Sequence, residues 1–339
     1  MHKMRFCTLA PSALLTLLVA CAAPFGSDER SAPEVDPNAV DPASNAAPGP
    51  RGQPEPGETG NAGEPPQLGL HYAHGAGPPT GGGSGAPLLT YHGGQIMQSS
   101  TITPIYWGAK WAAPTDPPSG FTGDKITGLQ DLYSGLAGSE YARSNEEYTD
   151  GTGHHVVTGL GSITVNPYII DNSTAPARAP KTSAIAAEVC AKIANPVPDG
   201  YYPVYTDTPR GSAGYCAWHS YTTCNNVPVQ FAFFFSLDGD SGCDPQDTKT
   251  THSQGLAALA SVTGHEWSEM MTDPRNGGWW DSGGNENADK CAWSFDDQLV
   301  TLTNGAQFKI QGNWSNAAYA AKSGYGTRTT NYPGCLPNL

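Results

Sequence analysis

The sequence predicts an α+β domain, in which a sheet is flanked by two or three helices and the loop-rich C-terminal half is tied by disulfides. Three observations support this fold class. Runs of β-branched and aromatic residues alternate with amphipathic helical patterns, the region after Pro274 is rich in Gly, Asn and Trp, and six cysteines follow residue 189. Because residues 22–67 contain almost no large apolar side chains and residues 74–87 are rich in Gly and Pro, we expect one folded domain over residues 88–339.

The individual elements follow from hydrophobic periodicity. The expected strands share β-branched and aromatic residues, and they are residues 100–108, two strands within 156–170, residues 202–207 and residues 228–238. The expected helices space apolar residues three and four apart, and they are residues 124–137, 181–194 and 251–272. The third helix ends at Asp273-Pro274, because proline disfavours helix in the residue before it. Asn304-Gly305 predicts a hairpin turn within residues 299–312.

Residues 1–21 have the pattern of a lipoprotein-type signal peptide. Lys3 and Arg5 precede an apolar run, residues 9–19, that is short for a membrane span. Residues 18–21 read LVAC, which resembles a bacterial lipobox, so we expect lipidation of Cys21 and a membrane anchor made of several acyl chains. Ordinary signal cleavage at the small residues around Cys21 is the alternative.

Residues 22–87 predict a disordered tether. Pro, Gly, Ala and acidic residues dominate this segment, and such a sequence cannot bury enough apolar surface to offset the entropy of ordering. The whole chain has a formal net charge of −14, with 14% charged residues. A nucleic-acid-binding protein needs a basic face to neutralise phosphate, so we expect no nucleic-acid partner.

The cysteine count predicts disulfides formed in an oxidising compartment. Cys7 and Cys21 belong to the signal region, and six cysteines remain: Cys190, Cys216, Cys224, Cys243, Cys291 and Cys335. An even number in an exported chain indicates three bridges, with fifteen pairings open. Zinc ligation by cysteine is disfavoured because the chain contains no Cys-x-x-Cys pair.

Residues 263–274, TGHEWSEMMTDP, carry the main chemical signal. Residues four apart lie on one face of a helix, so His265 and Glu269 point the same way, and Glu266 projects beside them. Zinc peptidases use this spacing to hold a metal and to place a glutamate as general base. Carboxylate oxygen is an acceptable zinc ligand, and a set with one histidine and two carboxylates leaves manganese, iron or calcium open as well.

A further ligand must come from another segment. Residues 279–293 follow the helix and offer Asp281, Glu286 and Asp289, while His219 lies on an earlier, expected loop. The alternative is that the polar residues of the helix form a solvated face without metal. Residues 238–247 resemble a calcium loop in their acid spacing, but the misplaced glycine and the missing final glutamate favour an ordinary acidic turn.

Four segments stand in order along the chain: LTYHGGQIMQSSTITPIYWG (89–108), YCAWHS (215–220), SVTGHEWSEMMTDP (261–274) and ENADKC (286–291). Together they resemble the phosphate-induced, or EXORDIUM-like, family of secreted proteins of plants and bacteria. The resemblance implies a zincin-like domain that binds zinc. It also implies that His265 and Glu269 are ligands, that Glu266 is the base, and that Glu286 or Asp289 is a third ligand.

The function expected from the sequence is that of an exported, lipid-anchored protein of the bacterial cell envelope with a zinc-dependent, peptidase-like hydrolase domain. Its substrate would be a peptide or a cell-wall polysaccharide. The alternative is a non-catalytic envelope protein that binds a partner or polysaccharide. In that case Trp279, Trp280 and Trp314, if exposed, could supply stacking surfaces for sugars, although buried core tryptophans are the more common outcome.

Overall fold

The computed structural model describes residues 64–76, 88–112, 120–324 and 333–336, all of which belong to the unit Pro50–Leu339. The expected signal peptide, Cys21 and most of the expected tether lie outside the described residues. In the described part of the chain, no helix combines the length and the hydropathy that a membrane span requires.

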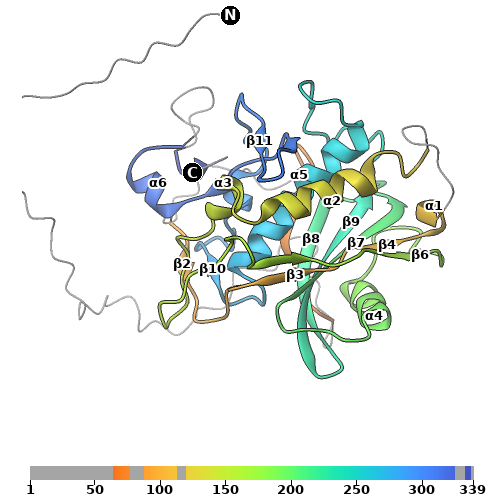
Figure 1. Cartoon of the computed structure of the whole chain (residues 1–339), viewed down its shortest axis with the longest axis horizontal. Coiled ribbons are helices and arrows are strands. Elements are labelled where there is room, and N and C mark those ends of the chain that lie inside the picture. Colours follow the sequence, from red (N-terminus) through yellow and green to blue (C-terminus); the bar gives the residue numbers. More distant parts are fainter. Residues whose placement is uncertain (1–63, 77–87, 113–119, 325–332, 337–339) are drawn as a thin grey trace, which may run out of the picture. The chain divides into compact units, whose positions relative to one another are not determined.

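The centre of the fold is a mixed sheet of eight strands in the order β1-β8-β9-β7-β3-β5, with β4 beside β7 and β6 beside β4 (Figure 1). The strands are β1 (Leu68–Tyr72), β3 (Ser100–Ile102), β4 (Ile105–Trp107), β5 (Ile163–Val165), β6 (Ile169–Asp171), β7 (Gly200–Pro209), β8 (Tyr215–Cys224) and β9 (Val227–Ser236). β8 pairs antiparallel with both β1 and β9, whereas the remaining pairs are parallel. A strand covered on both faces reads as a continuous apolar run, and eight successive residues of β9, 229–236, are buried as predicted.

Helices cover both faces of this sheet. α2 (Lys125–Leu136) and α5 (Gln254–Thr272) lie on one side, and α4 (Thr182–Lys192) lies on the other (Figure 1). The prediction of an α+β fold with a flanked sheet is therefore confirmed, and the three expected helices form within three residues of their expected ends. Short elements complete the fold: α1 (Ala109–Ala112), α3 (Glu140–Arg143), the 3-10 helix η2 (Asp289–Cys291) and α6 (Asn316–Ala320).

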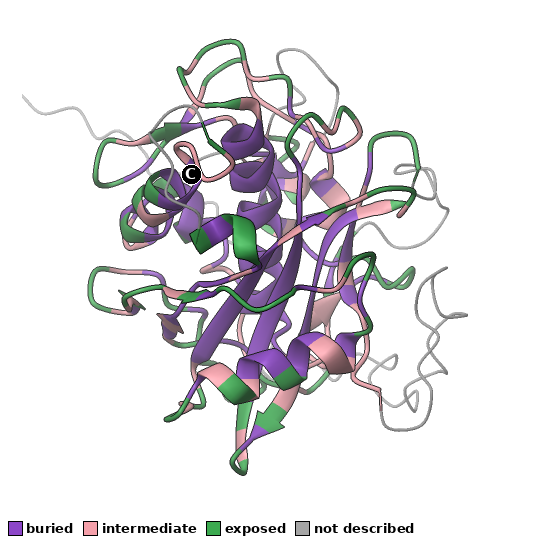
Figure 2. Ribbon diagram, turned by 90° about the vertical axis from the view of Figure 1, so that its right-hand side faces the viewer, coloured by how far each residue is buried: buried purple, intermediate pink, exposed green. Residues whose placement is uncertain are grey.

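α5 is the most enclosed helix, with every residue from 255 to 272 buried (Figure 2). Ser253 is its N-cap residue, and the Ser253 hydroxyl accepts a hydrogen bond from the backbone N–H of Leu256 at 3.1 Å. It ends at Asp273, before Pro274, as predicted. A helix that is buried all round has no solvated face. The alternative of a solvated face for its polar residues is therefore wrong.

The C-terminal half consists of loops with short strand pairs, as predicted. The pairs are β2 (Thr90–Tyr91) with β10 (Trp279–Trp280), β11 (Val300–Thr301) with β12 (Gln307–Phe308), and β13 (Asn313–Trp314) with β14 (Cys335–Leu336). The expected hairpin turn lies between β11 and β12, where Gly305 adopts a φ of +85°.

Three disulfides form, which confirms the expected number. Cys190–Cys224 joins α4 to β8, Cys216–Cys243 joins β8 to the loop after β9, and Cys291–Cys335 joins η2 to β14. Bridges of this kind are typical of proteins that fold in an oxidising compartment.

The expected start of the domain at residue 88 is wrong. β1 lies within the expected tether, yet it pairs with β8 at the edge of the sheet and buries Leu68 and Leu70. Before it, the Glu64 carboxylate accepts a hydrogen bond at 2.7 Å from the backbone N–H of Ser183 in the first turn of α4. Burial of these two leucines and pairing with β8 therefore offset the entropy of ordering this segment, although its composition predicted disorder.

Two further expectations need correction. The segment around His219 is strand β8 and not a loop, because Cys216 to Ser220 are buried between α4 and α5. The expected strand over residues 100–108 divides into β3 and β4 on either side of Pro104, since proline has no N–H to offer a neighbouring strand.

Candidate metal centre

His265, Glu266 and Glu269 lie on the buried length of α5, and each side chain is fully inaccessible to solvent. The helix can come this close to its neighbours because residue 264 is glycine. A Cβ there would approach Ile310 to 2.6 Å and the Tyr141 hydroxyl to 2.8 Å. The sequence therefore places three ionisable side chains inside the protein, where charge is stable only when it is compensated.

The first group of ligand atoms surrounds His265. Its Nε2 lies 3.1 Å from Oε1 of Glu269 and 3.5 Å from Oδ1 of Asp289, and it makes no hydrogen bond. Two atoms that ligate one zinc ion lie about 2.0–2.2 Å from it, so they are separated by about 3.3 Å in a tetrahedral site and by at most about 4.4 Å. The spacing of these three side chains fits a shared cation.

The second group surrounds His219, which reaches the site from β8. Its Nε2 lies 3.3 Å from Oε2 of Glu286 and 3.9 Å from Oε2 of Glu269. Glu266 is close as well, because its carboxylate, His219 and Glu269 each offer a ligand atom within 4.8 Å of the other two. Neither nitrogen of His219 and neither oxygen of Glu266 has a hydrogen-bond partner. Buried polar atoms without partners are rare in folded proteins.

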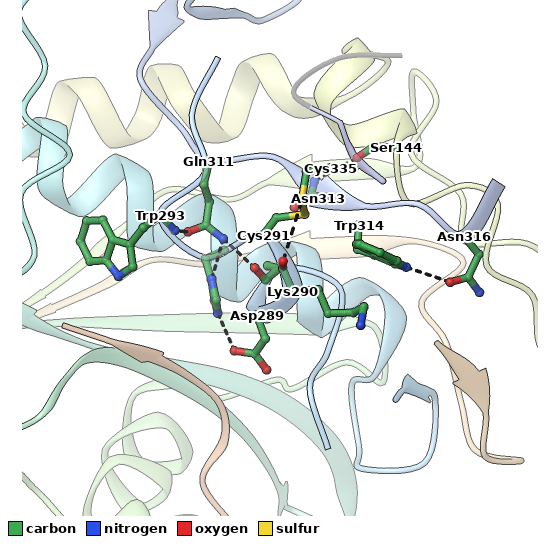
Figure 3. The surroundings of a disulfide bond; sticks show 12 residues. Ser144, Asp289, Lys290, Cys291, Trp293, Gln311, Asn313, Trp314, Asn316 and Cys335 are labelled. Carbon is green, nitrogen blue, oxygen red and sulfur yellow. Dashed lines mark hydrogen bonds and ion pairs between the residues drawn. A yellow bond between two sulfur atoms is a disulfide. The ribbon is translucent and has the colours of Figure 1, made fainter. Parts of the chain in front are cut away.

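The segment that supplies Glu286 and Asp289 is held against α5 by neutral contacts. Asn287 donates to the Asn145 side-chain oxygen at 2.6 Å and to the Ser268 hydroxyl at 2.9 Å, and Ser268 donates to Asn145 at 2.7 Å. The Cys291–Cys335 disulfide fixes the end of this segment (Figure 3). These contacts bring Asp289 to the helix, where its backbone N–H donates to Oε1 of Glu269 at 2.9 Å.

The Gln311 side chain contacts the His265 ring. Its Nε2 lies 2.9 Å from Nδ1 of His265 and donates to the carbonyl of Ala288 at 2.9 Å, while its Oε1 lies 3.1 Å from Nε2 of His71. Ligation through Nε2 of His265 needs the opposite orientation of this amide, in which the oxygen accepts from the Nδ1–H. The two orientations have the same shape, but the flipped amide gives up its hydrogen bond to the Ala288 carbonyl.

Burial dominates the electrostatics of the cluster. Burial raises the pKa of Glu266 well above its usual value, although the positive charge of His265 partly offsets this. Burial, followed by the charge of Asp289, raises the pKa of Glu269 to about 7. Burial likewise raises the pKa of Glu286 and lowers that of His219 to about 3, which leaves the imidazole neutral.

The donor set suits a divalent cation. Across the described residues, no Lys or Arg forms an ion pair with Glu266, Glu269, Glu286 or Asp289. The cluster thus combines two imidazoles with carboxylates that no Lys or Arg neutralises, and nitrogen and oxygen donors of this kind bind zinc, manganese or iron.

Of the acids considered for the third ligand, Glu286 and Asp289 reach the cluster and Asp281 does not. Asp281 accepts from Asn285 at 3.0 Å and pairs with Lys290 at 2.8 Å. His71 is a neighbour that the sequence did not indicate, because it lies on β1 inside the expected tether. Its ring centroid is 4.4 Å from that of His265.

The acidic loop after β9 is an ordinary turn, as the sequence favoured. Asp238 pairs with Lys125 at 2.6 Å, Asp240 pairs with Arg210 at 2.7 Å, and Asp247 accepts from the Lys249 backbone at 2.8 Å. Within the described residues, the two groups of potential metal ligands both lie at the α5 cluster.

Trp314 is a buried core tryptophan, which was the more common outcome, and not an exposed stacking surface. Its side chain is buried, stacks near Tyr319 with ring centroids 5.0 Å apart, and lies beneath the Lys290 ammonium. Trp279 and Trp280 are half-buried on β10, where Trp280 stacks on His92 at 3.2 Å. The indole of Trp314 therefore cannot serve as an open platform for a sugar.

Comparison of the chain with protein-family models, with curated proteins and with solved structures gives no match. The resemblance to EXORDIUM-like proteins and the zincin-like character of the domain therefore stay predictions from the sequence.

Proposed function

We propose that this chain is an exported metal-dependent hydrolase with a peptidase-like centre, in which His265, Glu269 and Asp289 hold the ion and Glu266 is the general base. The observation that supports it most is the set of buried ligand atoms without hydrogen-bond partners, above all both oxygens of Glu266. A divalent ion at this position would supply Lewis-acid character toward a carbonyl group and lower the pKa of water.

The residues around this position have separable roles. Glu266 lies one residue from His265 on α5 and has no competing hydrogen bond, so its carboxylate is free to take a proton from water and return it to the leaving group. A cation beside it favours the ionised form against the effect of burial. Asp289 retains 17% exposure, unlike the other ligands of the first group, which makes its side of the cluster the approach for a substrate.

We place this activity in the cell envelope of a bacterium, with the chain held to the membrane through a lipidated Cys21. The three disulfides support an oxidising compartment. Membership of the EXORDIUM-like family, a zincin-like fold and a peptide substrate belong to the same proposal, and they rest on the sequence motifs around His265 and residues 286–291.

The burial of the ligand side chains favours a second candidate function, in which the metal site is structural. His219, His265, Glu266 and Glu269 are all inaccessible, and the backbone of β1 packs against the cluster at Gly69. A closed centre of this kind is typical of a structural metal site. In that case the chain would be a non-catalytic envelope protein that binds a partner or polysaccharide.

Metal analysis combined with hydrolysis assays separates these functions. The whole chain, exported so that its disulfides form, would be analysed for bound metal and assayed with a library of peptides. We expect metal in the wild type and in Glu266→Gln, and a fall in hydrolysis of at least 100-fold in the variant.

Glu188→Gln is the matched control, because Glu188 is a buried glutamate on α4 whose pKa burial raises to about 7. It should keep both metal and hydrolysis. Metal without hydrolysis in the wild type would support the structural site. Loss of metal from Glu266→Gln would make Glu266 a ligand and contradict its role as base, and a wild type that binds no added zinc or manganese would overturn both functions.

A further inference from the structure

The two groups of ligand atoms share one residue, Glu269, but use its two oxygens separately. Oε1 faces Nε2 of His265 at 3.1 Å, and Oε2 faces Nε2 of His219 at 3.9 Å. The two histidines do not fall within one group of mutually close ligand atoms. A single ion would therefore have to leave one histidine without a role.

We propose that this centre binds two divalent cations bridged by the Glu269 carboxylate. The first ion is the one of the proposed function, at His265 and Asp289. The second lies between His219, Oε2 of Glu269 and Oε2 of Glu286. The inference rests on the proposed function for the first ion and adds a second position.

The two distances from the His219 nitrogen fit one ion. Oε2 of Glu286 is 3.3 Å and Oε2 of Glu269 is 3.9 Å from the His219 nitrogen, both below the separation of about 4.4 Å that one zinc ion can span. All three atoms are buried and none has a hydrogen-bond partner. Two-metal centres, with ions about 3.5–4 Å apart, recur among hydrolases.

Charge balance gives an independent reason for two ions. The cluster contains four carboxylates, namely Glu266, Glu269, Glu286 and Asp289, together with the two ligand histidines. With all four carboxylates ionised, one divalent ion would leave two negative charges uncompensated, whereas two ions neutralise all four. Buried charge without compensation is costly. The oxygen-rich donor set suits Mn²⁺ or Fe²⁺ as well as Zn²⁺.

β1 packs directly against the second position, where residue 69 is glycine. A Cβ at Gly69 would lie 1.9 Å from Oε2 of Glu269 and 2.7 Å from Nε2 of His219. The φ of +51° at this residue also favours glycine. A methyl group here would displace Oε2 of Glu269 and the His219 ring, the two groups that the second position uses.

The test is the metal content of the whole disulfide-bonded chain, stripped with a chelator, reloaded with Zn²⁺ or Mn²⁺ and desalted. We expect two ions per chain in the wild type. One ion should remain in His219→Gln, in Gly69→Ala and in Asp289→Ala, and none in Glu269→Ala. Loaded with Mn²⁺, the wild type should show an exchange-coupled electron paramagnetic resonance spectrum, and His219→Gln should show that of an isolated ion.

Gly75→Ala is the matched control for Gly69→Ala. Gly75 has a φ of +76°, so alanine costs the same kind of backbone strain, but no atom lies within 4 Å of its Cβ position. It should retain two ions. Near-ultraviolet circular dichroism identifies any variant that fails to fold, and His219→Gln tests the second position without change at Gly69.

The outcomes separate this inference from the proposed function. One ion in the wild type, unchanged in His219→Gln and lost in Asp289→Ala, would overturn the second position and leave the proposed function intact. A wild type without metal would overturn both. Two ions with no detectable hydrolysis would support the bridged centre and contradict the hydrolase.

Discussion

Two buried polar clusters lie next to each other on α5, and they differ in how their atoms are paired. Ser268, Asn145 and Asn287 form the neutral cluster, in which each side chain makes hydrogen bonds of 2.6 to 2.9 Å. The ionisable cluster includes Glu269, the next residue of the helix after Ser268. In this cluster His219, Glu266 and one oxygen of Glu286 have no hydrogen-bond partner.

This difference in hydrogen bonding distinguishes polar residues that stabilise the fold from polar residues that are available to bind a ligand. A neutral hydrogen-bonded network stabilises the fold and fixes the segment from residue 286 to 291 against the helix. Unpaired ionisable groups at the same depth destabilise the fold unless a bound ion compensates them. In the absence of metal, neighbouring residues of one helix thus have opposite effects on the free energy of unfolding. The hydrogen-bonded cluster also fixes the position of the ionisable cluster.

The largest expected effect compares Glu269→Gln with Ser268→Ala by chemical unfolding, with and without Zn²⁺. Zinc at 100 times its Kd should raise the free energy of unfolding of the wild type by about 2.7 kcal/mol per ion. Glu269→Gln should abolish this gain. Ser268→Ala should lower the free energy of unfolding by about 1–2 kcal/mol in the absence of metal and keep the gain. Equal gains in both variants would show that the two clusters do not differ in function.

The next effect is the pH dependence of the metal-free protein. Burial raises the pKa of Glu266 and Glu286 well above 4.5 and that of Glu269 to about 7, so the folded chain holds protons that the unfolded chain has released. Its free energy of unfolding should therefore fall as pH rises. The lowered pKa of His219 opposes this only below pH 6.5.

Urea unfolding in chelator between pH 6.5 and pH 8 measures this slope, which should amount to a loss on the order of 3 kcal/mol. Measuring in a Glu188→Gln background removes the only other glutamate of the described residues whose pKa is raised. With zinc the slope should vanish or reverse, because metal binding requires the deprotonated carboxylates. A metal-free protein whose stability rises over this range would contradict the assignment of buried carboxyls.

The smallest effect concerns Gln311, which belongs to neither cluster but contacts His265. Gln311→Ala should weaken metal binding about 10–100-fold by releasing the orientation of the imidazole, as loss of an outer hydrogen-bond partner does at other metal sites. Titration with a competing chelator measures the Kd. Asp281→Asn is the control, since Asp281 pairs with Lys290 outside the cluster, and its Kd should equal that of the wild type.

The sequence by itself determined the helices and the core of the site. Periodicity and the Asp273-Pro274 stop located α5, and the four-residue repeat of a helix is enough to put His265 and Glu269 on one side. Glu286 and Asp289 were also identified, because acids just after such a helix are the nearest source of ligands. Local rules suffice for these features, since each depends on residues close together in the chain.

Only the tertiary structure decided the rest. β1 was missed because its stabilisation comes from pairing with β8, about 150 residues further along the chain, and its flanking Gly and Pro residues look like tether. The same pairing brings His219 and Gly69 to Glu269. Which carboxylate oxygen faces which histidine depends on the packing of β8, α5 and η2 against one another. Such contacts join residues with no shared periodicity, so no sequence pattern could encode them.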